Sequence, residues 1–139
     1  MAEDCIFCKI IRGEIPCAKI FENERVLAFL DINPFNEGHA LLIPKEHFSR
    51  LEDCPGSVMS ALAQQIPTLV EAILKAVRAE GCNIVNNNGR CAGQLVDHVH
   101  FHIIPRRQGD GVVQYGPHGV YPEGRMGELA DQIREHLPQ

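Results

Sequence analysis

The stretch Asp-His-Val-His-Phe-His-Ile-Ile-Pro-Arg, from Asp97 to Arg106, carries a histidine at every second position. Side chains of a β-strand alternate between the two faces of its sheet, so His98, His100 and His102 are expected on one face and the apolar residues between them on the other. The rings would line an open face, each about 6.5–7 Å from the next. Pro105 is expected to end the strand because it has no N–H for the ladder.

Three imidazoles on one face favour a site over a chance arrangement, since Thr, Lys and Glu are more common on a solvated strand face. Imidazole serves as nucleophile, acid, base or metal ligand near neutral pH. Ligands of one zinc ion must converge to about 2 Å from it, so rings spaced along a strand do not suit a metal centre built from all three histidines. The pattern therefore indicates catalysis by histidine.

The composition is that of a globular protein with one domain. The chain has 139 residues, of which 45% are hydrophobic and 22% charged, and its net charge is −5. We expect one domain over 1–139, with a core over about 5–107 and a tail over 108–139. The acidic balance argues against nucleic-acid and membrane partners. No basic segment precedes an apolar run, and no segment approaches about 18 apolar residues, which predicts a cytoplasmic protein with reduced cysteines.

Periodicity and turn signals predict an α+β fold, with a long helix packed against an antiparallel sheet. A proline inside the long helix is expected to kink it or divide it in two. The expected helices are 5–13, 57–80 and 128–137, and the expected strands are 18–22, 26–31, 39–44, 83–87 and the histidine stretch.

Several motifs now occur in a recognisable order. They are Cys5-x-x-Cys8, Asp31 at a strand end, the stretch 38–45, the turn 87–93, and Gln94 ahead of the three histidines. Together they resemble the histidine triad (HIT) family of nucleotide hydrolases and transferases. The resemblance extends over about residues 5–107. It implies a single HIT-like domain, a homodimer whose two sheets join edge to edge, and a purine-nucleotide site in each protomer.

The resemblance assigns the nucleophile to His100. A neutral imidazole forms a labile N–P bond, so a nucleotidyl-histidine can form and then be hydrolysed. A backbone carbonyl would hold Nδ1–H of His100 and leave Nε2 free. His102 would donate to the phosphoryl oxygens or the leaving group, while His39 and His98 complete the catalytic set. A buried structural histidine is the alternative for His39.

The implied reaction releases a nucleoside monophosphate from a phosphoramidate, a mixed anhydride or a dinucleoside polyphosphate. The alternative from another class is a nucleotide-binding regulatory module with weak turnover. Leu95 departs from the family pattern, because phosphoramidase-type members carry Ser there and diadenosine-polyphosphate-type members carry Thr. A leucine cannot bond or protonate the leaving group, so the preferred leaving group stays open.

The resemblance also implies substrate contacts. Asp31 would accept from the ribose hydroxyls, with a solvated strand end as the alternative. Asn87 and Gln94 would contact phosphate, and Gly93 would let backbone N–H groups approach it. Ordinary turn chemistry is the alternative for Asn87. The nucleobase would lie among apolar side chains that, taken singly, resemble plain core: Ile6, Ile10, Phe29 and Ile32.

The Cys-x-x-Cys pair is open to three interpretations: redox activity, half of a metal site, or no role. The βαβ context of a redox pair is missing from the expected elements. A subset of similar bacterial-type members implies a closed structural zinc site with four ligands, here Cys5, Cys8, His47 and His98. Such a site would explain why the first histidine of the triad is needed when the second is the nucleophile. Free thiols are the alternative.

Overall fold

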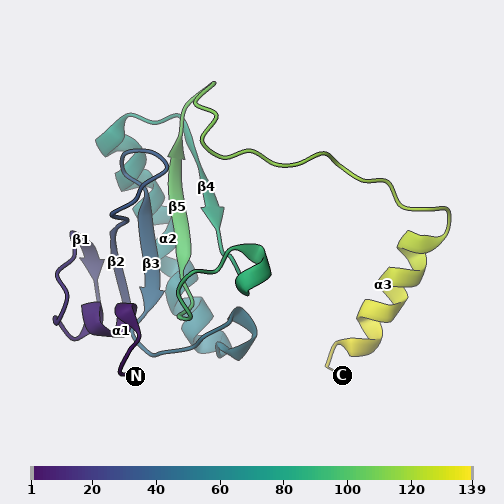
Figure 1. Cartoon of the computed structure of the whole chain (residues 1–139), viewed down its shortest axis with the longest axis horizontal. Coiled ribbons are helices and arrows are strands. Elements are labelled where there is room, and N and C mark those ends of the chain that lie inside the picture. The colour runs from purple at the N-terminus through teal and green to yellow at the C-terminus, as the bar shows by residue number, and fades with distance from the viewer. Residues whose placement is uncertain (1, 139) are drawn as a thin grey trace.

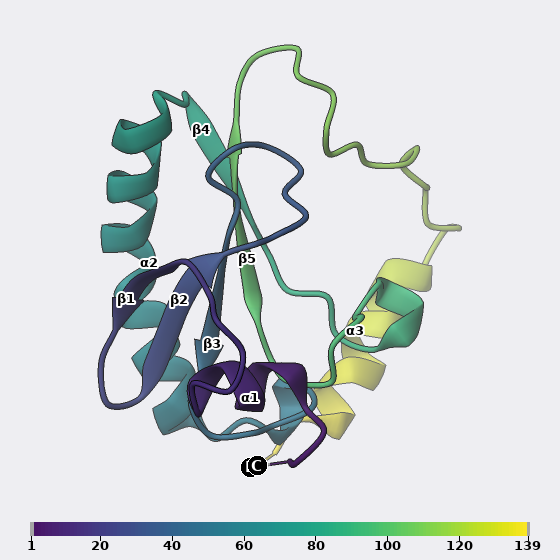
Figure 2. The same cartoon turned by 60° about the vertical axis from the view of Figure 1, so that its left-hand side comes forward.

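The computed structural model describes residues 2–138 and contains a five-stranded antiparallel sheet in the order β1-β2-β3-β5-β4. The elements are α1 (Ile6–Ile11), β1 (Lys19–Glu22), β2 (Val26–Leu30), β3 (Ala40–Pro44), the short 3-10 turn η1 (Leu51–Asp53), α2 (Gly56–Val77), β4 (Gly81–Val85), the 3-10 turn η2 (Arg90–Ala92), β5 (Phe101–Arg106) and α3 (Arg125–His136). The long helix α2 lies along one face of the sheet (Figure 1), and α1 lies at the end of the opposite face (Figure 2). The predicted α+β fold is confirmed.

Both faces of the central strands are buried. In β2, Val26 and Ala28 join the hydrophobic cluster beneath α2, whereas Leu27 and Phe29 join a second cluster that includes Phe7 of α1. The residues of β3 alternate in the same way. Burial on both faces explains why these strands read as continuous apolar runs rather than as alternating patterns.

The histidine stretch differs from the prediction in its extent and its exposure. β5 begins only after His100, because Val99 N–H donates to the Phe48 carbonyl at 2.7 Å and so lies outside the sheet ladder. The ring centroids of His100 and His102 are 5.1 Å apart, closer than strand spacing would give. His98 is 0% exposed and His100 is 5% exposed. The face that carries the histidines is therefore covered, not open.

Pro105 does not end β5, contrary to the prediction. It pairs with Cys82 of β4, while the pairing of β5 with β3 stops at Ile103. The Pro105 carbonyl accepts from Asn36 Nδ2 at 2.9 Å. The nitrogen and the carbonyl of a strand residue point to the same side, so the proline nitrogen faces the side on which β3 has already ended. The missing N–H therefore costs the ladder nothing.

Several other boundaries differ from the prediction, among them the end of α2, which lies at Val77 rather than at 80. β4 starts at Gly81, two residues before the expected strand, and ends at Val85, so Asn86 lies beyond it. The Asn86 side chain donates to the His100 carbonyl at 2.9 Å. α2 continues through Pro67 as one helix rather than two. α3 begins at Arg125 and includes Gly127, which the prediction left in the preceding loop.

α2 is long and apolar enough to cross a membrane by length and composition alone, although the sequence predicts no membrane segment. However, its buried residues pack in the core cluster against the sheet: Val58, Leu62, Leu69 and Ile73. The core helix of a domain meets the same criteria, and this packing identifies α2 as such a helix.

The close approach of the loop before β3 to the end of α2 can be tested at Gly38. Its φ is +94°, and a Cβ there would lie 2.8 Å from Val77 Cγ1 and 3.2 Å from Pro105 Cγ. Gly13 has a similar φ of +81° but open space around it. We expect Gly13→Ala to cost about 1–2 kcal/mol from backbone strain. Gly38→Ala should cost about 1–3 kcal/mol more from overpacking. Urea denaturation of both variants measures the difference, and equal losses would contradict the close packing at Gly38.

Candidate functional site: three oriented histidines and a cysteine-histidine cluster

His100 is held as a nucleophile would be. Its Nδ1 lies 2.7 Å from the His98 carbonyl, and a carbonyl only accepts, so Nδ1 carries the proton and Nε2 keeps its lone pair. Burial lowers the pKa of His100, although the bond to the His98 carbonyl and the charge of Asp31 oppose the shift. The ring is therefore neutral at pH 7, with its free nitrogen at Nε2.

Phe7 packs directly on this ring, which the sequence analysis missed. The ring centroids of Phe7 and His100 are 5.1 Å apart with the planes at 85°, and Phe7 also meets His98 edge to face at 5.8 Å. Phe7 lies inside the Cys-x-x-Cys motif, so its position between two candidate ligands was the available signal. The sequence also gave no indication of the role of Asn86, whose side chain donates to the His100 carbonyl at 2.9 Å.

His102 is oriented by a chain of two hydrogen bonds. The backbone N–H of Phe35 donates to Nδ1 of His39 at 3.1 Å, so a neutral His39 carries its proton on Nε2. This nitrogen lies 2.9 Å from Nδ1 of His102 and donates to it. A neutral His102 then carries its own proton on Nε2 and presents it as a donor. The structure thus places His39 against the third ring of the triad, where the expected orienting role is possible.

Asp31 lies beside these rings, and its side chain is 19% exposed. Its Oδ2 is 3.5 Å from Nε2 of His39, and its Oδ1 accepts from the backbone N–H of Asn33 at 2.9 Å. Burial lowers the pKa of His39, while the charge of Asp31 opposes this shift. The carboxylate therefore lies beside the ring of His39.

The first histidine of the triad points away from the other two. His98 donates Nε2–H to the Pro44 carbonyl at 2.8 Å, which leaves its Nδ1 lone pair facing a cluster of cysteine and histidine side chains. Nδ1 lies 3.4 Å from Cys5 Sγ, 3.6 Å from Cys8 Sγ and 3.2 Å from His47 Nδ1. Cys8 Sγ is 3.4 Å from His47 Nδ1. These four side chains meet, as the expected ligand set requires.

The donor atoms fit a tetrahedral zinc ion. Zn–N bonds of about 2.0–2.1 Å and Zn–S bonds of about 2.3 Å put two nitrogen ligands about 3.3 Å apart and a nitrogen and a sulfur about 3.6 Å apart. The four separations given above range from 3.2 to 3.6 Å, and all four donor atoms lie within 4.8 Å of one another. Two thiolates and two imidazoles are also a common structural zinc set.

The three triad rings therefore do not converge on one metal, but the reason differs from the predicted spacing. His98 Nδ1 faces the cysteines, His100 Nδ1 bonds a carbonyl, and His102 Nδ1 bonds His39. Each ring has its own partner, and each partner fixes a different orientation.

Gln94, which follows the turn η2, forms hydrogen bonds within the protein in place of the expected contact with phosphate. Gln94 is 3% exposed, and its Oε1 accepts from Gly89 N–H at 2.7 Å. Its Nε2 donates to the carbonyls of Ser49 at 2.7 Å and Val96 at 3.0 Å. Both donors of the amide are used, so the side chain braces the loop instead of facing phosphate.

The other two predicted phosphate residues lie together. Gly93 has a φ of +97°, and a Cβ built there would be 3.8 Å from the amide of Asn87. The turn η2 ends at Gly93 in this left-handed conformation, which favours glycine.

The predicted nucleobase residues divide into two pairs. Ile6 and Ile32 are 46% and 89% exposed, so they are open to a ligand. Phe29 is 4% exposed and packs with Phe7 at a centroid distance of 5.7 Å, and Ile10 packs against the same cluster. The inner pair is mainly core in this structure.

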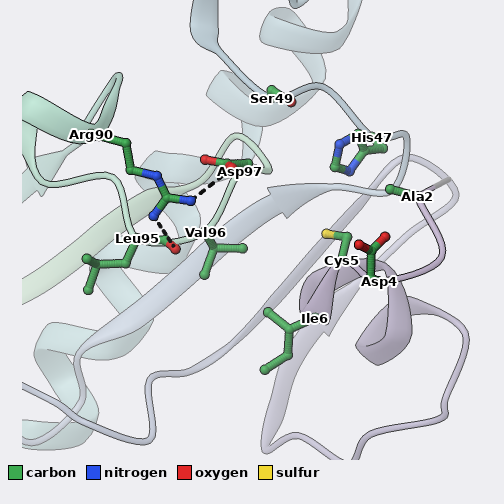
Figure 3. A pocket seen from close by; sticks show the side chains of 10 residues that line it. All are labelled: Ala2, Asp4, Cys5, Ile6, His47, Ser49, Arg90, Leu95, Val96 and Asp97. Carbon is green, nitrogen blue, oxygen red and sulfur yellow. Dashed lines mark hydrogen bonds and ion pairs between the residues drawn. The ribbon is translucent and has the colours of Figure 1, made fainter.

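A hollow of about 340 Å³ opens beside the cysteine-histidine cluster (Figure 3). Cys5 and His47 line one side, and Arg90 lies across from them. Arg90 bonds the Asp97 carboxylate at 2.9 Å and the Leu95 carbonyl at 3.1 Å. The hollow thus gives solvent a path to the candidate ligands, and neither His100 nor His102 lines it.

The orientation of His102 predicts a pH titration. Burial first, and then the neighbouring His100 and His39, lower the pKa of His102 from 6.5 to about 4. An unfolded chain protonates this ring at the higher pH, so stability that depends on neutral His102 is lost as the pH falls from 6.5 towards 4. A ¹⁵N NMR titration of the histidine rings measures the pKa and the tautomer. A midpoint near 6.5, or a proton on Nδ1 at pH 7, would contradict the hydrogen-bond chain.

Comparison with known proteins agrees with these motifs. The HIT domain model matches residues 12–109. The adenosine 5'-monophosphoramidase hnt1 of Schizosaccharomyces pombe is 51% identical over 102 residues, which are 73% of this chain and 74% of that protein. The crystal structure of a HIT family member from Bacillus subtilis, 37% identical, covers 99% of both chains with a TM-score of 0.93. A zinc-bound histidine triad family protein from Mycobacterium smegmatis, 35% identical, covers 96% of this chain and 98% of its own with a TM-score of 0.76. The chain belongs to the histidine triad (HIT) family.

Proposed function

We propose that this protein releases a purine nucleoside monophosphate from a phosphoramidate, a mixed anhydride or a dinucleoside polyphosphate, through a covalent intermediate on His100. The observation that carries the proposal is the bond from His100 Nδ1 to the His98 carbonyl, which leaves Nε2 as a neutral nucleophile. The resemblance to an adenosine 5'-monophosphoramidase supports an adenosine nucleotide as substrate.

The first step forms one bond and breaks one. The Nε2 lone pair of His100 attacks the α-phosphorus, and the bond from phosphorus to the leaving group breaks with its electron pair on the leaving group. The His100 ring becomes positively charged, and the His98 carbonyl stabilises this charge through Nδ1–H. His102 donates Nε2–H to a phosphoryl oxygen, where negative charge develops.

Hydrolysis then regenerates the histidine. Water attacks the phosphorus, the P–Nε2 bond breaks, and its electron pair returns to the ring. The water loses one proton to solvent, and the nucleoside monophosphate leaves. His102 is neutral at pH 7, so it serves as a hydrogen-bond donor rather than as a strong acid. A leaving group that departs as a stable anion needs no proton. An amine leaving group needs one, and because Leu95 has no proton to donate, we propose that the amine takes it from solvent water.

The substrate contacts follow from exposure and free polar groups. Asp31 is proposed to accept from the ribose hydroxyls beside its contact with His39. Asn87 and the backbone around Gly93 are proposed to bind the phosphate. Ile6 and Ile32 are proposed to cover the nucleobase, with Ile10 and Phe29 supporting them from the core. Gln94 is not proposed to bind phosphate, because its amide group braces the loop through the carbonyls of Ser49 and Val96.

We also propose zinc at Cys5, Cys8, His47 and His98. The spacing of the donors and the zinc-bound relative support it. When bound, zinc supplies a structural cross-link between α1 and the triad. His98 would then be fixed at both ring nitrogens, and its carbonyl would hold the His100 ring more rigidly.

The remaining proposals concern assembly and location. A homodimer joined through the sheet is supported by β4, which is the last strand of the sheet within residues 2–138. A cytoplasmic location is supported by six cysteines, all of which are free thiols in the described chain. The net charge of −5 supports a small-molecule substrate over nucleic acid.

Substitution of the nucleophile tests the reaction. We expect His100→Ala to lower turnover of adenosine phosphoramidate by several orders of magnitude, because binding alone does not replace a nucleophile. His118→Ala, which removes an exposed histidine of the loop before α3, should keep full activity. Quenching wild type with labelled substrate at mildly alkaline pH should leave the label on His100.

Rapid turnover without a label on His100 would mean direct attack by water and would overturn the covalent mechanism. Nucleotide binding without turnover on phosphoramidate, adenylyl sulfate and dinucleoside polyphosphates would favour a regulatory module. The same panel of substrates identifies the preferred leaving group.

The zinc proposal predicts a metal-dependent melting temperature. Protein purified without chelator should contain about one zinc per chain by mass spectrometry. Cys8→Ser should lose the metal and melt earlier, because α1 loses its link to His98. Cys91→Ser changes an exposed cysteine outside the cluster and should match wild type. Zinc far below one per chain in wild type, together with equal melting of both variants, would end this proposal.

A further inference from the structure

The loop between β2 and β3, residues 31–38, carries groups on which the proposed site depends. Asp31 begins the loop with the candidate ribose contact. The backbone N–H of Phe35 donates to Nδ1 of His39 at 3.1 Å and so sets the tautomer of that ring. Figure 1 places the loop at the end of the sheet where β5 also ends. The position of the loop therefore affects both the candidate substrate contact and, through His39, the proton on His102.

Little packing holds the middle of this loop in place. Ile32 and Phe35 are 89% and 58% exposed. The Phe35 ring stacks on the His39 ring, with the centroids 5.7 Å apart and the planes at 12°. Within residues 2–138, Asn36 is the one member of the loop whose side chain donates hydrogen bonds to another part of the chain. Asn36 is therefore the candidate for the anchor of the loop.

The Asn36 amide has two partners that suit its two hydrogens. Its Nδ2 lies 2.9 Å from the Pro105 carbonyl and 2.9 Å from Asp110 Oδ2. Both partners only accept, so each takes one N–H of the amide, whereas a serine has a single donor and an aspartate has none. The Asn36 carbonyl accepts from the backbone N–H of His39 at 3.0 Å. Asn36 thus joins the segment around the end of β5 to the backbone of His39.

The carboxylate that holds Asn36 is itself fixed. Asp110 accepts from Arg106 Nε at 3.0 Å and from the backbone N–H of Arg107 at 2.8 Å, and Arg106 also donates to Asn83 of β4 at 2.7 Å. The side chains of Arg106 and Asp110 are 23% and 14% exposed. The Arg106 guanidinium holds the pKa of the Asp110 carboxyl well below its usual range, so this carboxylate is ionised at neutral pH. A charged acceptor makes the bond from Asn36 a strong one.

We propose that Asn36 is a positioning residue for His39 and His102. Its two bonds hold the loop so that the Phe35 N–H stays on Nδ1 of His39. His39 then keeps its proton on Nε2 and donates to Nδ1 of His102, which keeps a donor at its own Nε2. The effect on turnover rests on the proposed function, in which His102 donates to a phosphoryl oxygen. The effect on the tautomers does not.

Two other contacts act on the same ring. Asp31 Oδ2 lies 3.5 Å from Nε2 of His39 and also favours a proton there. This distance is long for a hydrogen bond, whereas the Phe35 N–H bond has an ordinary length. The stacked Phe35 ring is a second means of holding the loop. The test must therefore separate the effect of Asn36 from the effects of Asp31 and Phe35.

Three variants of the full-length protein provide this separation. Asn36→Ala removes both donors, Asp110→Ala removes one acceptor, and Asn33→Ala changes an exposed asparagine of the same loop whose side chain forms no hydrogen bond among the described residues. ¹⁵N NMR of the imidazole rings at pH 7 measures the tautomers, and thermal melting confirms that each variant is folded. In Asn36→Ala the ratio of the Nε2–H to the Nδ1–H tautomer of His39 should fall at least about fivefold, the factor for one lost hydrogen bond.

The other two variants should differ in a graded way. Asp110→Ala should move the ratio in the same direction by less, because the Pro105 carbonyl still accepts from Asn36. The double variant should be no worse than Asn36→Ala alone, because the two substitutions remove a shared contact. Asn33→Ala should match wild type. With adenosine phosphoramidate, Asn36→Ala should lower kcat by less than the roughly 10²–10³-fold expected when a donor to a developing oxyanion is removed outright.

An unchanged His39 tautomer in folded Asn36→Ala and Asp110→Ala would overturn the proposal and leave Asp31 as the group that sets the proton. An equal shift in Asn33→Ala would also overturn it, because any change in the loop would then act alike. A shifted tautomer with unchanged kcat would support the positioning role of Asn36 and overturn the donor role of His102 in the proposed function.

Discussion

The hydrogen bond of 2.7 Å from His100 Nδ1 to the His98 carbonyl is the contact on which the site depends. It needs His98 to be fixed, and His98 is held by its ring, whose Nε2–H reaches the Pro44 carbonyl at the end of β3. The free nitrogen of the same ring enters the cysteine-histidine cluster. His98 therefore joins the sheet, the N-terminal helix and His100, the proposed nucleophile. A substitution at His98 would remove its contacts with all three parts of the site.

Backbone groups, rather than other charges, set the protonation of the triad. The Pro44 carbonyl fixes His98, the His98 carbonyl fixes His100, and the Phe35 N–H fixes His102 through His39. Burial lowers the pKa of all four rings, so each stays neutral near pH 7. A neutral ring with a fixed tautomer is either a nucleophile or a donor at a given nitrogen, never both. The arrangement thus separates the two roles that the proposed phosphoryl chemistry needs.

The sequence predicts a residue's role when that role follows from the alternation of side chains along a strand. It does not predict a role that depends on contact with a residue far away in the chain. Alternation put Val99 and Ile103 in the core, and both are buried. It could not show that Phe7 would cover the histidine face, because the contact joins residues more than 90 positions apart. The bracing role of Gln94 depends on the Ser49 carbonyl, which no local pattern reveals. The sequence predicts a strand end at Pro105 because it does not show that the pairing with β3 stops at Ile103, before the proline is reached.

β4 is the element in which the proposed catalysis and the proposed assembly meet. Near its start, Asn83 accepts from Arg106 and so holds the C-terminal end of β5. Just past its end, Asn86 donates to the His100 carbonyl and so holds the backbone of the nucleophile. Five residue steps of β5 separate Phe101 from Arg106, a span of about 17 Å. His100 and Arg106 therefore lie at opposite ends of β5, yet each is hydrogen-bonded to an asparagine in β4 or just past its end. A partner strand that stabilised the free edge of β4 would therefore stabilise both hydrogen bonds, the one from Arg106 to Asn83 and the one from Asn86 to the His100 carbonyl.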